Sequence, residues 1–152
     1  MELISSNDIE YITTEEVLED EINWVIEKSE EMIKHCVDNG GAGLAAPQVG
    51  IFKSFFIFSP KPEVFQIVIN PKWFPDGKKI NTVEGCLSYP GKTYYMSRYK
   101  YISTTFYGRN KKTGKMERIS KKYSGDAAII FQHEADHLIG KTINTEGRLL
   151  DG

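Results

Sequence analysis

The sequence predicts an α+β fold, and three observations support this class. A helix with an apolar face is expected near the N-terminus, a second helix is expected near the C-terminus, and the segments between them have the composition of strands. Because the strands cluster between the helices and do not alternate with them, the pattern favours α+β over a parallel α/β sheet. At 152 residues the chain is long enough for one domain with a buried core, so residues 1–152 are expected to form a single domain.

The bulk composition excludes several classes of protein. Hydrophobic residues make up 40% and charged residues 26%, which disfavours a disordered or membrane protein, and a net charge of -2 lacks the basic excess of most nucleic-acid binders. No secretory signal is visible in the acidic N-terminal segment, so we do not expect secretion, and the apolar run Phe55–Phe58 is too short to cross a bilayer. Two cysteines, Cys36 and Cys86, are too few for a disulfide framework. We expect a cytoplasmic location, or a host cytoplasm or organelle for a viral or organellar source.

The first helix is expected to begin at Thr13 and Glu16, which have capping-box spacing. Behind them, apolar residues recur at steps of three and four from Leu18 to Val37, which predicts an amphipathic helix. The helix should end at the run "DNGG", because asparagine and glycine accept the left-handed conformation that ends a helix. The following segment, "GAGLAAPQVG" at 41–50, is poor in bulky side chains, so its backbone can be approached closely.

Aromatic and β-branched residues predict strands in the middle of the chain. The tip "RNKKTGK" between the last two strands is interpreted as a solvated hairpin turn in preference to a nucleic-acid patch, because the whole chain is slightly acidic. A second helix is expected from about Asp126 to Gly140. The predicted strands are "SFFIFS" at 54–59, "FQIVIN" at 65–70, "YKYISTTFYG" at 99–108 and "KMERISKKY" at 115–123.

The second helix contains "FQHEADHLIG", a pattern typical of a catalytic metal site. His133 and His137 are four residues apart, so on a helix they lie on one face with Cβ atoms about 5–6 Å apart and can bind one ion. Glu134 lies beside the first histidine and can reach a water on that ion without being a ligand itself. The alternative is a pair of buried histidines that the backbone satisfies.

A catalytic site of this kind needs a third protein ligand, and the residues alone leave several candidates. Metzincin proteases are excluded, because Ile143 stands where their third histidine would be. Glu146 is the only later glutamate, and His35 and Cys36 fall within the first helix. Cys86 differs, because it lies in "EGCLSYPG", a non-helical segment that can present a thiolate, although a small buried core residue is the alternative.

Three segments together resemble the signature motifs of the peptide deformylase family. They are "GAGLAAPQVG" at 41–50, "EGCLS" at 84–88 and "QHEADH" at 132–137, and they occur in the family's order and at similar separations. The resemblance spans nearly the whole chain. It implies mostly antiparallel β-sheets packed around a central C-terminal HExxH helix, with the amphipathic helix at the N-terminus.

The resemblance also implies roles for individual residues. Cys86, His133 and His137 would be the metal ligands, and Glu134 would be the general base and acid. The Gln48 side chain and the Leu87 backbone N–H would stabilise the oxyanion. The expected substrate-binding residues are Gly41, Ala42, Gly43, Glu84, Gly85, Ile129 and Ile130.

The implied reaction is removal of the N-formyl group from nascent polypeptides that begin with formyl-methionine, by attack of a metal-activated water with release of formate. The implied cofactor is one divalent metal per chain, with Fe²⁺ expected in cells and Zn²⁺, Ni²⁺ or Co²⁺ able to occupy the site. The expected partners are formylmethionyl peptides and, transiently, the ribosome. We expect a monomer with no membrane contact and no direct nucleic-acid specificity.

The sequence departs from many bacterial members after the histidine helix. The remaining segment, "LIGKTINTEGRLLDG", is too short for the long charged C-terminal helix that helps some members dock to the ribosome. Docking is therefore not expected to rely on such a helix.

Two other functions remain open from the residues. One is a structural zinc site with Cys36 or His35 as a fourth ligand, which would leave Glu134 and Gln48 without a role. The other is a metallopeptidase that cleaves ordinary peptide bonds.

Overall fold

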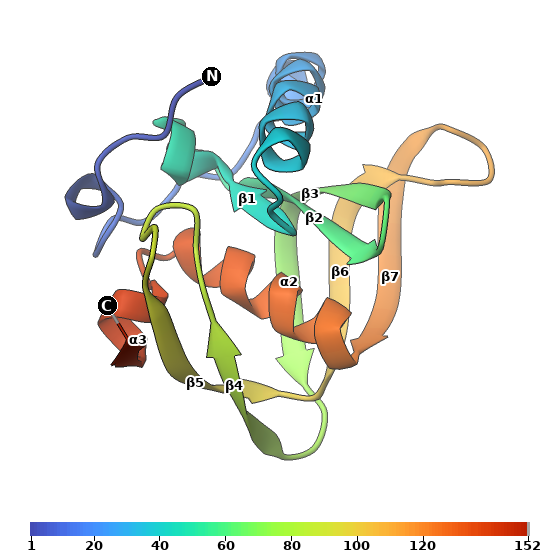
Figure 1. Ribbon diagram of the computed structural model, residues 1–152. Coiled ribbons are helices and arrows are strands. Elements are labelled where there is room, and N and C mark those ends of the chain that lie inside the picture. The colour runs from blue at the N-terminus through green and yellow to red at the C-terminus, as the bar shows by residue number, and fades with distance from the viewer. Residues whose placement is uncertain (152) are drawn as a thin grey trace.

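An antiparallel five-stranded sheet separates the two long helices in the computed structural model, which describes residues 1–151. Gly152, the last residue of the expected domain, lies outside the described residues. In Figure 1 this sheet is seen behind and beside α2, with the β6–β7 hairpin projecting from the body. Its strands, in the order β1-β2-β3-β6-β7, are Gly43–Ala45, Phe55–Lys61, Val64–Pro75, Tyr101–Arg109 and Met116–Ser124.

A smaller antiparallel sheet lies beside the C-terminal helix. Its order is β4-β5-β8, with bounds Lys79–Glu84, Thr93–Tyr99 and Arg148–Asp151. The helix between the sheets is α2 (Gly125–His137), and a single-turn helix, α3 (Ile143–Glu146), precedes β8. The expected α+β class, with antiparallel sheets around the HExxH helix, is confirmed.

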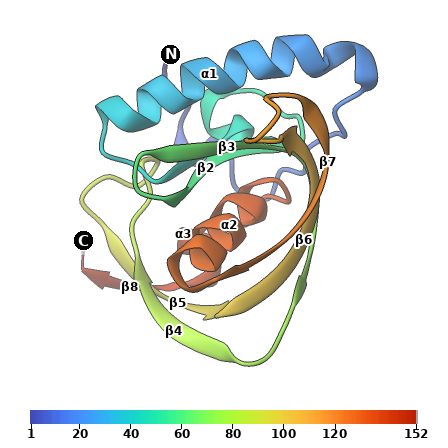
Figure 2. The ribbon, with the colours of Figure 1, turned by 90° about the vertical axis from the view of Figure 1, so that its right-hand side faces the viewer.

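Strand β2 explains why a helix can pack on each side of the larger sheet. Alternate side chains of a strand point to opposite faces, and β2 is apolar on both. Phe55 and Ile57 belong to the core cluster that includes α1 (Ile22–Asp38), whereas Phe56 and Phe58 belong to the cluster that includes α2. Figure 2 shows α1 lying across one side of the sheet and α2 enclosed on the other.

The first helix starts later than the sequence predicts. The chain from Thr13 to Val17 is not helical, and α1 begins at Ile22 after a 3-10 turn at Glu19–Glu21. The expected start is wrong because a distant residue holds this segment. The Asn70 side chain accepts a hydrogen bond from the Val17 N–H at 2.8 Å and donates one to the Val17 carbonyl at 2.9 Å. The helix ends at Asp38, just before the predicted glycines.

The predicted strands are present, but the segment expected at 99–108 is divided. Tyr99 ends β5 in the small sheet, and Tyr101 begins β6 in the large one, so the chain changes sheets at Lys100. Strands β1, β4 and β8 were not predicted, nor was β5 apart from Tyr99. The mixed polar sequences of β4 and β8 have weak strand character.

The histidine helix ends at His137, three residues before the expected Gly140. Gly140 has a φ of +77°, and a side chain there would collide with the backbone of Tyr11 and Ile12. Among the described residues, no helix is long and apolar enough to cross a membrane.

Candidate active site

Helix α2 and the loop between β4 and β5 bring the three sequence-predicted ligands together. The His133 and His137 rings have centroids 5.3 Å apart, and the ligand atoms of both residues and Cys86 all lie within 4.8 Å of one another. Cys86 Sγ is 3.6 Å from His137 Nε2. A thiolate and an imidazole on one tetrahedral metal, at ordinary bond lengths of about 2.3 and 2.1 Å, would be about 3.6 Å apart. The cluster therefore has the dimensions of a site for a single ion.

A buried chain of charged groups orients the first histidine. His133 Nδ1 is 2.8 Å from Glu84 Oε1, which directs its Nε2 away from Glu84. Arg98 donates two hydrogen bonds to the same carboxylate, at 3.0 Å and 2.9 Å, and a third to Asp136 on α2. Burial alone would raise the pKa of Glu84, but the hydrogen bonds from His133 and Arg98 lower it to about 2. Glu84 is thus an anionic partner for a ligand histidine, an arrangement that raises ligand basicity.

The second histidine is held in its neutral form. Burial, followed by the nearby His133 and Arg98, lowers the pKa of His137 well below its usual value. A neutral imidazole is the form that binds metals. Its Nδ1 is buried and has no hydrogen-bond partner among the described residues, so no bond at that nitrogen orients the ring.

Glu134 places a carboxylate next to this cluster. The side chain is 4% exposed, and its Oε1 is buried without a hydrogen-bond partner within residues 1–151. Burial raises the pKa of Glu134 to about 7. The carboxylate fits only because Gly43 lacks a side chain, since a Cβ there would lie 2.6 Å from Glu134 Oε2. A buried carboxylate with a free oxygen and a near-neutral pKa is suited to proton transfer.

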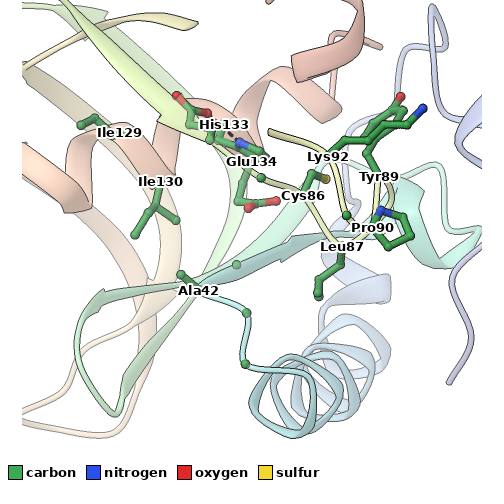
Figure 3. Close-up of a pocket in the computed structure, with 16 residues that line it drawn as sticks. Ala42, Cys86, Leu87, Tyr89, Pro90, Lys92, Ile129, Ile130, His133 and Glu134 are labelled. Atoms are coloured by element: carbon green, nitrogen blue, oxygen red, sulfur yellow. Dashed lines mark hydrogen bonds and ion pairs between the residues drawn. The ribbon is translucent and has the colours of Figure 1, made fainter. Parts of the chain in front are cut away.

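A pocket of about 440 Å³ opens onto these groups (Figure 3). Its volume falls within the usual range of about 300–1,000 Å³ for ligand sites. All seven residues predicted to bind substrate line it, and Cys86, Leu87, His133 and Glu134 line it as well. Figure 3 shows Ile129 and Ile130 on one side and the Cys86 loop on the other.

Gln48 and Leu87 differ in how they relate to the pocket. The Gln48 side chain does not line it: its Nε2 donates to Ser88 Oγ at 2.9 Å and to Cys86 Sγ at 3.5 Å, and its Oε1 accepts from the Ala45 N–H. Leu87 does line it, and its N–H has no hydrogen-bond partner among the described residues. The Gln48 amide thus contacts the Cys86 sulfur, whereas the Leu87 N–H is left without a hydrogen-bond partner among the described residues.

Sequence reasoning missed several residues of the site. Arg98 and Asp136 were not predicted, because only the packing of β5 against α2 brings them together. Four further pocket residues could have been predicted from their position shortly after Cys86 in the sequence. A loop that presents a metal ligand also forms the neighbouring wall of the pocket. The four residues are Tyr89, Pro90, Gly91 and Lys92.

The other candidate ligands lie outside the cluster. Within residues 1–151, the group that can hold a metal contains neither His35, Cys36 nor Glu146. Cys36 packs in the core between α1 and the sheet, and burial raises the pKa of its thiol to about 12, which opposes the thiolate form. The three ligands therefore have no fourth protein ligand among the described residues, which disfavours a closed structural zinc site.

Comparison with known proteins gives one consistent result. The profile of the polypeptide deformylase family matches residues 6–148. A peptide deformylase of Buchnera aphidicola subsp. Cinara cedri is 41% identical over 109 residues, which cover 68% of each chain. Peptide deformylase 2 of Coxiella burnetii is 32% identical over 122 residues, and the match spans 73% of this chain but only 58% of that relative.

Solved structures show the same similarity over nearly the whole chain. Peptide deformylase from Thermotoga maritima superimposes with a TM-score of 0.83 at 32% identity and covers 95% of both chains. A probable peptide deformylase from synechococcus phage S-SSM7 gives a TM-score of 0.80 at 31% identity, over 96% of this chain and 99% of that one. With its fold, its three motifs and these relatives in agreement, the chain belongs to the polypeptide deformylase family.

Proposed function

We propose that the protein is a metal-dependent peptide deformylase, which removes the N-formyl group from the formyl-methionine of nascent polypeptides and releases formate. The observation that carries this proposal is the convergence of Cys86, His133 and His137 within 4.8 Å, beside the buried Glu134 carboxylate. We take residues 1–152 as one catalytic domain. We also propose that it works as a cytoplasmic monomer, and that it meets nascent chains through transient association with ribosomes.

Cys86, His133 and His137 would hold one divalent metal ion. The spacing of Cys86 and His137, the neutral state of His137 and the anionic partner of His133 all support this assignment. Because one thiolate and two imidazoles suit several metals, we propose Fe²⁺ in cells, with Zn²⁺, Ni²⁺ or Co²⁺ as substitutes. When bound, such an ion would supply Lewis acidity that lowers the pKa of water toward about 7 and polarises the formyl carbonyl.

Glu134 would move the proton during hydrolysis. Its carboxylate would accept a proton from the attacking water and deliver it to the departing amine nitrogen, because an amide anion is a very poor leaving group. A base works best when its pKa is near the operating pH, and burial raises the pKa of Glu134 to about 7. Its unpartnered Oε1 leaves an acceptor free for that water.

The negative charge that develops on the formyl oxygen during the reaction would be stabilised by hydrogen-bond donors. The free N–H of Leu87, in the pocket wall, would be one donor. The Gln48 amide would be the second, after its Nε2 gives up or shares its contact with Ser88. Each donor of this kind typically lowers the barrier by roughly 3–4 kcal/mol.

The peptide would bind along an exposed strand edge. Strand β1 pairs with β2 on one side only, so its other edge can accept an extended peptide. Gly41 and Gly43 line the pocket, and the space that a side chain on either would need is taken by Cys36 and Glu134 respectively. The half-buried Ile129 and Ile130 would contact the methionine side chain.

Hydrolysis of a formylated tripeptide tests this proposal directly. With formyl-Met-Ala-Ser as substrate and bound metal measured in the same sample, formate and free Met-Ala-Ser should appear in equal amounts. Unformylated Met-Ala-Ser is the control and should stay intact. Cleavage of an internal amide without formate release would instead identify a metallopeptidase and end the deformylase proposal.

Metal removal separates a catalytic ion from a structural one. A chelator should abolish formate release while circular dichroism shows that most of the fold remains, and added Fe²⁺ or Ni²⁺ should restore activity. Collapse of the fold on chelation would support a structural ion, because such an ion contributes folding free energy.

A further inference from the structure

A second hollow, of about 760 Å³, lies between the β2–β3 turn and the β6–β7 hairpin, and positively charged residues line both of its walls. We call it the basic groove. One wall contains Lys61 at the end of β2, and the hairpin tip adds Lys111 and Lys112. The hairpin that carries the tip projects from the body in Figure 1. The tip is an exposed hairpin turn, as the sequence predicts, and it also forms one side of a larger surface.

Strand β7 forms the other wall. Alternate side chains of β7 point to opposite faces of the sheet, and Lys121 lies on the face of Tyr123, which lines the hollow, with its Nζ 5.6 Å from the centre of the Tyr123 ring. The one acidic residue in the described lining, Glu117, lies on the same face, and its carboxylate accepts a hydrogen bond from the Asn110 side chain at 2.6 Å. Three segments that are separate in the sequence thus bring four cationic side chains to one hollow: Lys61, Lys111, Lys112 and Lys121.

The small net charge of the chain conceals a strong separation of charge. Residues 1–50 contain two lysines and twelve acidic residues, whereas residues 51–125 contain fifteen lysines and arginines and four acidic residues. A concentrated positive surface attracts anions even when the whole protein is slightly acidic. The low net charge of the chain therefore does not exclude a nucleic-acid surface on this face.

The positive charge in the groove is largely uncompensated. Lys61, Lys112 and Lys121 are exposed and form no ion pair within the described residues. Burial, and then the positive charges of Lys121, Lys61 and Arg109, lower the pKa of Lys111. Repulsion of this kind within a folded protein is relieved when an anion binds between the cations.

We propose that the basic groove binds the phosphate backbone of RNA without reading its base sequence. A nucleic-acid strand carries one negative charge per nucleotide, so a strand laid along the groove presents regularly repeated anions to both walls. Tyr123 in the floor is only 7% exposed and packs against Phe131, so it cannot stack on a base. The available contacts are thus to phosphate, which position a strand but do not specify it.

Two other roles could explain the positive charge of this surface, namely protection of a sheet edge and binding to a membrane. Each of them explains fewer of its features than RNA binding does. Lysines on an edge strand prevent pairing with other chains, and β7 is an edge strand, but this role does not explain Lys61 or Lys112 on the opposite wall. An anionic membrane surface is generally bound by a face with projecting apolar side chains, whereas here the cations surround a hollow.

Fluorescence anisotropy with a labelled single-stranded RNA of 20 nucleotides and mixed sequence tests the inference. In about 50 mM salt the wild-type protein should bind with a dissociation constant in the micromolar range, and the affinity should fall steeply by about 200 mM salt. The triple variant Lys61→Glu, Lys112→Glu and Lys121→Glu should bind at least tenfold more weakly. Loss of three phosphate contacts should also reduce the salt slope by about 2.

A matched variant controls for total charge. Lys34→Glu, Lys78→Glu and Lys141→Glu change the charge equally at three exposed lysines outside the groove, and RNA affinity should stay within twofold. Both triple variants should deformylate a short formyl-peptide like wild type, so failure of one proposal is distinguishable from failure of the other. The inference is overturned by absence of saturable RNA binding, by equal loss in both triple variants, or by equal binding of polyglutamate or anionic lipid vesicles at matched charge.

Discussion

The two hollows of this protein use charge in opposite ways. At the active site, Glu84, Arg98 and His133 are buried and paired with one another at 2.8–3.0 Å. In the basic groove, Lys112 and Lys121 are exposed and without ion pairs among the described residues. Buried charges must be paired because desolvation is costly, and pairing also fixes their positions. Exposed cations are left available for an external anion.

This contrast predicts different consequences of mutation. Changes in the active-site network should alter chemistry, metal binding and stability, because the same groups serve all three. Changes on the groove rim should alter only the binding of an anion. The largest effects are therefore expected at the buried network and the smallest at the rim.

Glu134→Gln should nearly abolish deformylation while retaining the metal. The amide has the shape of the carboxylate but cannot accept the proton of water, so kcat/KM for a formyl-peptide should fall by about 10³-fold. Formate release measures the rate, and elemental analysis of the same sample measures the metal. Turnover above a tenth of wild type would show that another group moves the proton.

Arg98→Met should destabilise the fold. It leaves Glu84 without its two Arg98 hydrogen bonds and Asp136 without its ion pair, and breaking a buried pair costs about 3 kcal/mol or more in the free energy of unfolding. Urea unfolding of the metal-loaded protein gives the value. Lys78→Met, at an exposed position, is the control and should change it by about 0.5 kcal/mol or less. Equal effects of the two substitutions would refute the structural role of Arg98.

Glu84→Gln should weaken metal binding without removing a ligand. His133 Nδ1 would lose its anionic partner, and loss of such a partner typically lowers metal affinity by about 10–100-fold. Competition with a chelator of known affinity measures the change. Unchanged affinity would mean that the helix alone orients His133.

The sequence predicts the metal cluster better than it predicts what surrounds it. His133 and His137 are one helical turn apart, so a local pattern is enough, and the family resemblance adds Cys86. The partners Arg98 and Asp136 depend on how β5 packs against α2, and no short pattern carries that information.

The same distinction explains the misplaced helix start and the groove. Capping-box spacing at Thr13 and Glu16 is a local signal, but the Asn70 side chain, 53 residues beyond Val17, holds that segment extended. The sequence shows that lysines are clustered in the β6–β7 hairpin. It does not show that Lys61 lies across a hollow from β7, because only the fold brings these two segments together.

Tyr123→Phe should show that the groove's floor belongs to the core. Burial raises the pKa of Tyr123 to about 12 from 10.0, so the unfolded chain loses this proton first as the pH rises. The stabilisation is therefore complete below pH 10 and is lost as the pH rises toward 12. Between pH 9 and 11 the wild type should lose about 1 kcal/mol more than Tyr123→Phe in the free energy of unfolding. Tyr95→Phe, at an exposed tyrosine, should leave the wild-type slope unchanged.

The rim substitutions Lys61→Glu, Lys112→Glu and Lys121→Glu should have the smallest effect on the protein itself. These side chains have no ion pairs to lose within residues 1–151, and each lies among like charges, so replacing them by glutamate removes repulsion. Urea unfolding should change by about 0.5 kcal/mol or less, and formyl-peptide hydrolysis should stay within twofold. A large loss of stability or activity would show that the rim supports the fold as the active-site network does. If both stay unchanged while RNA binding falls, the two hollows act independently.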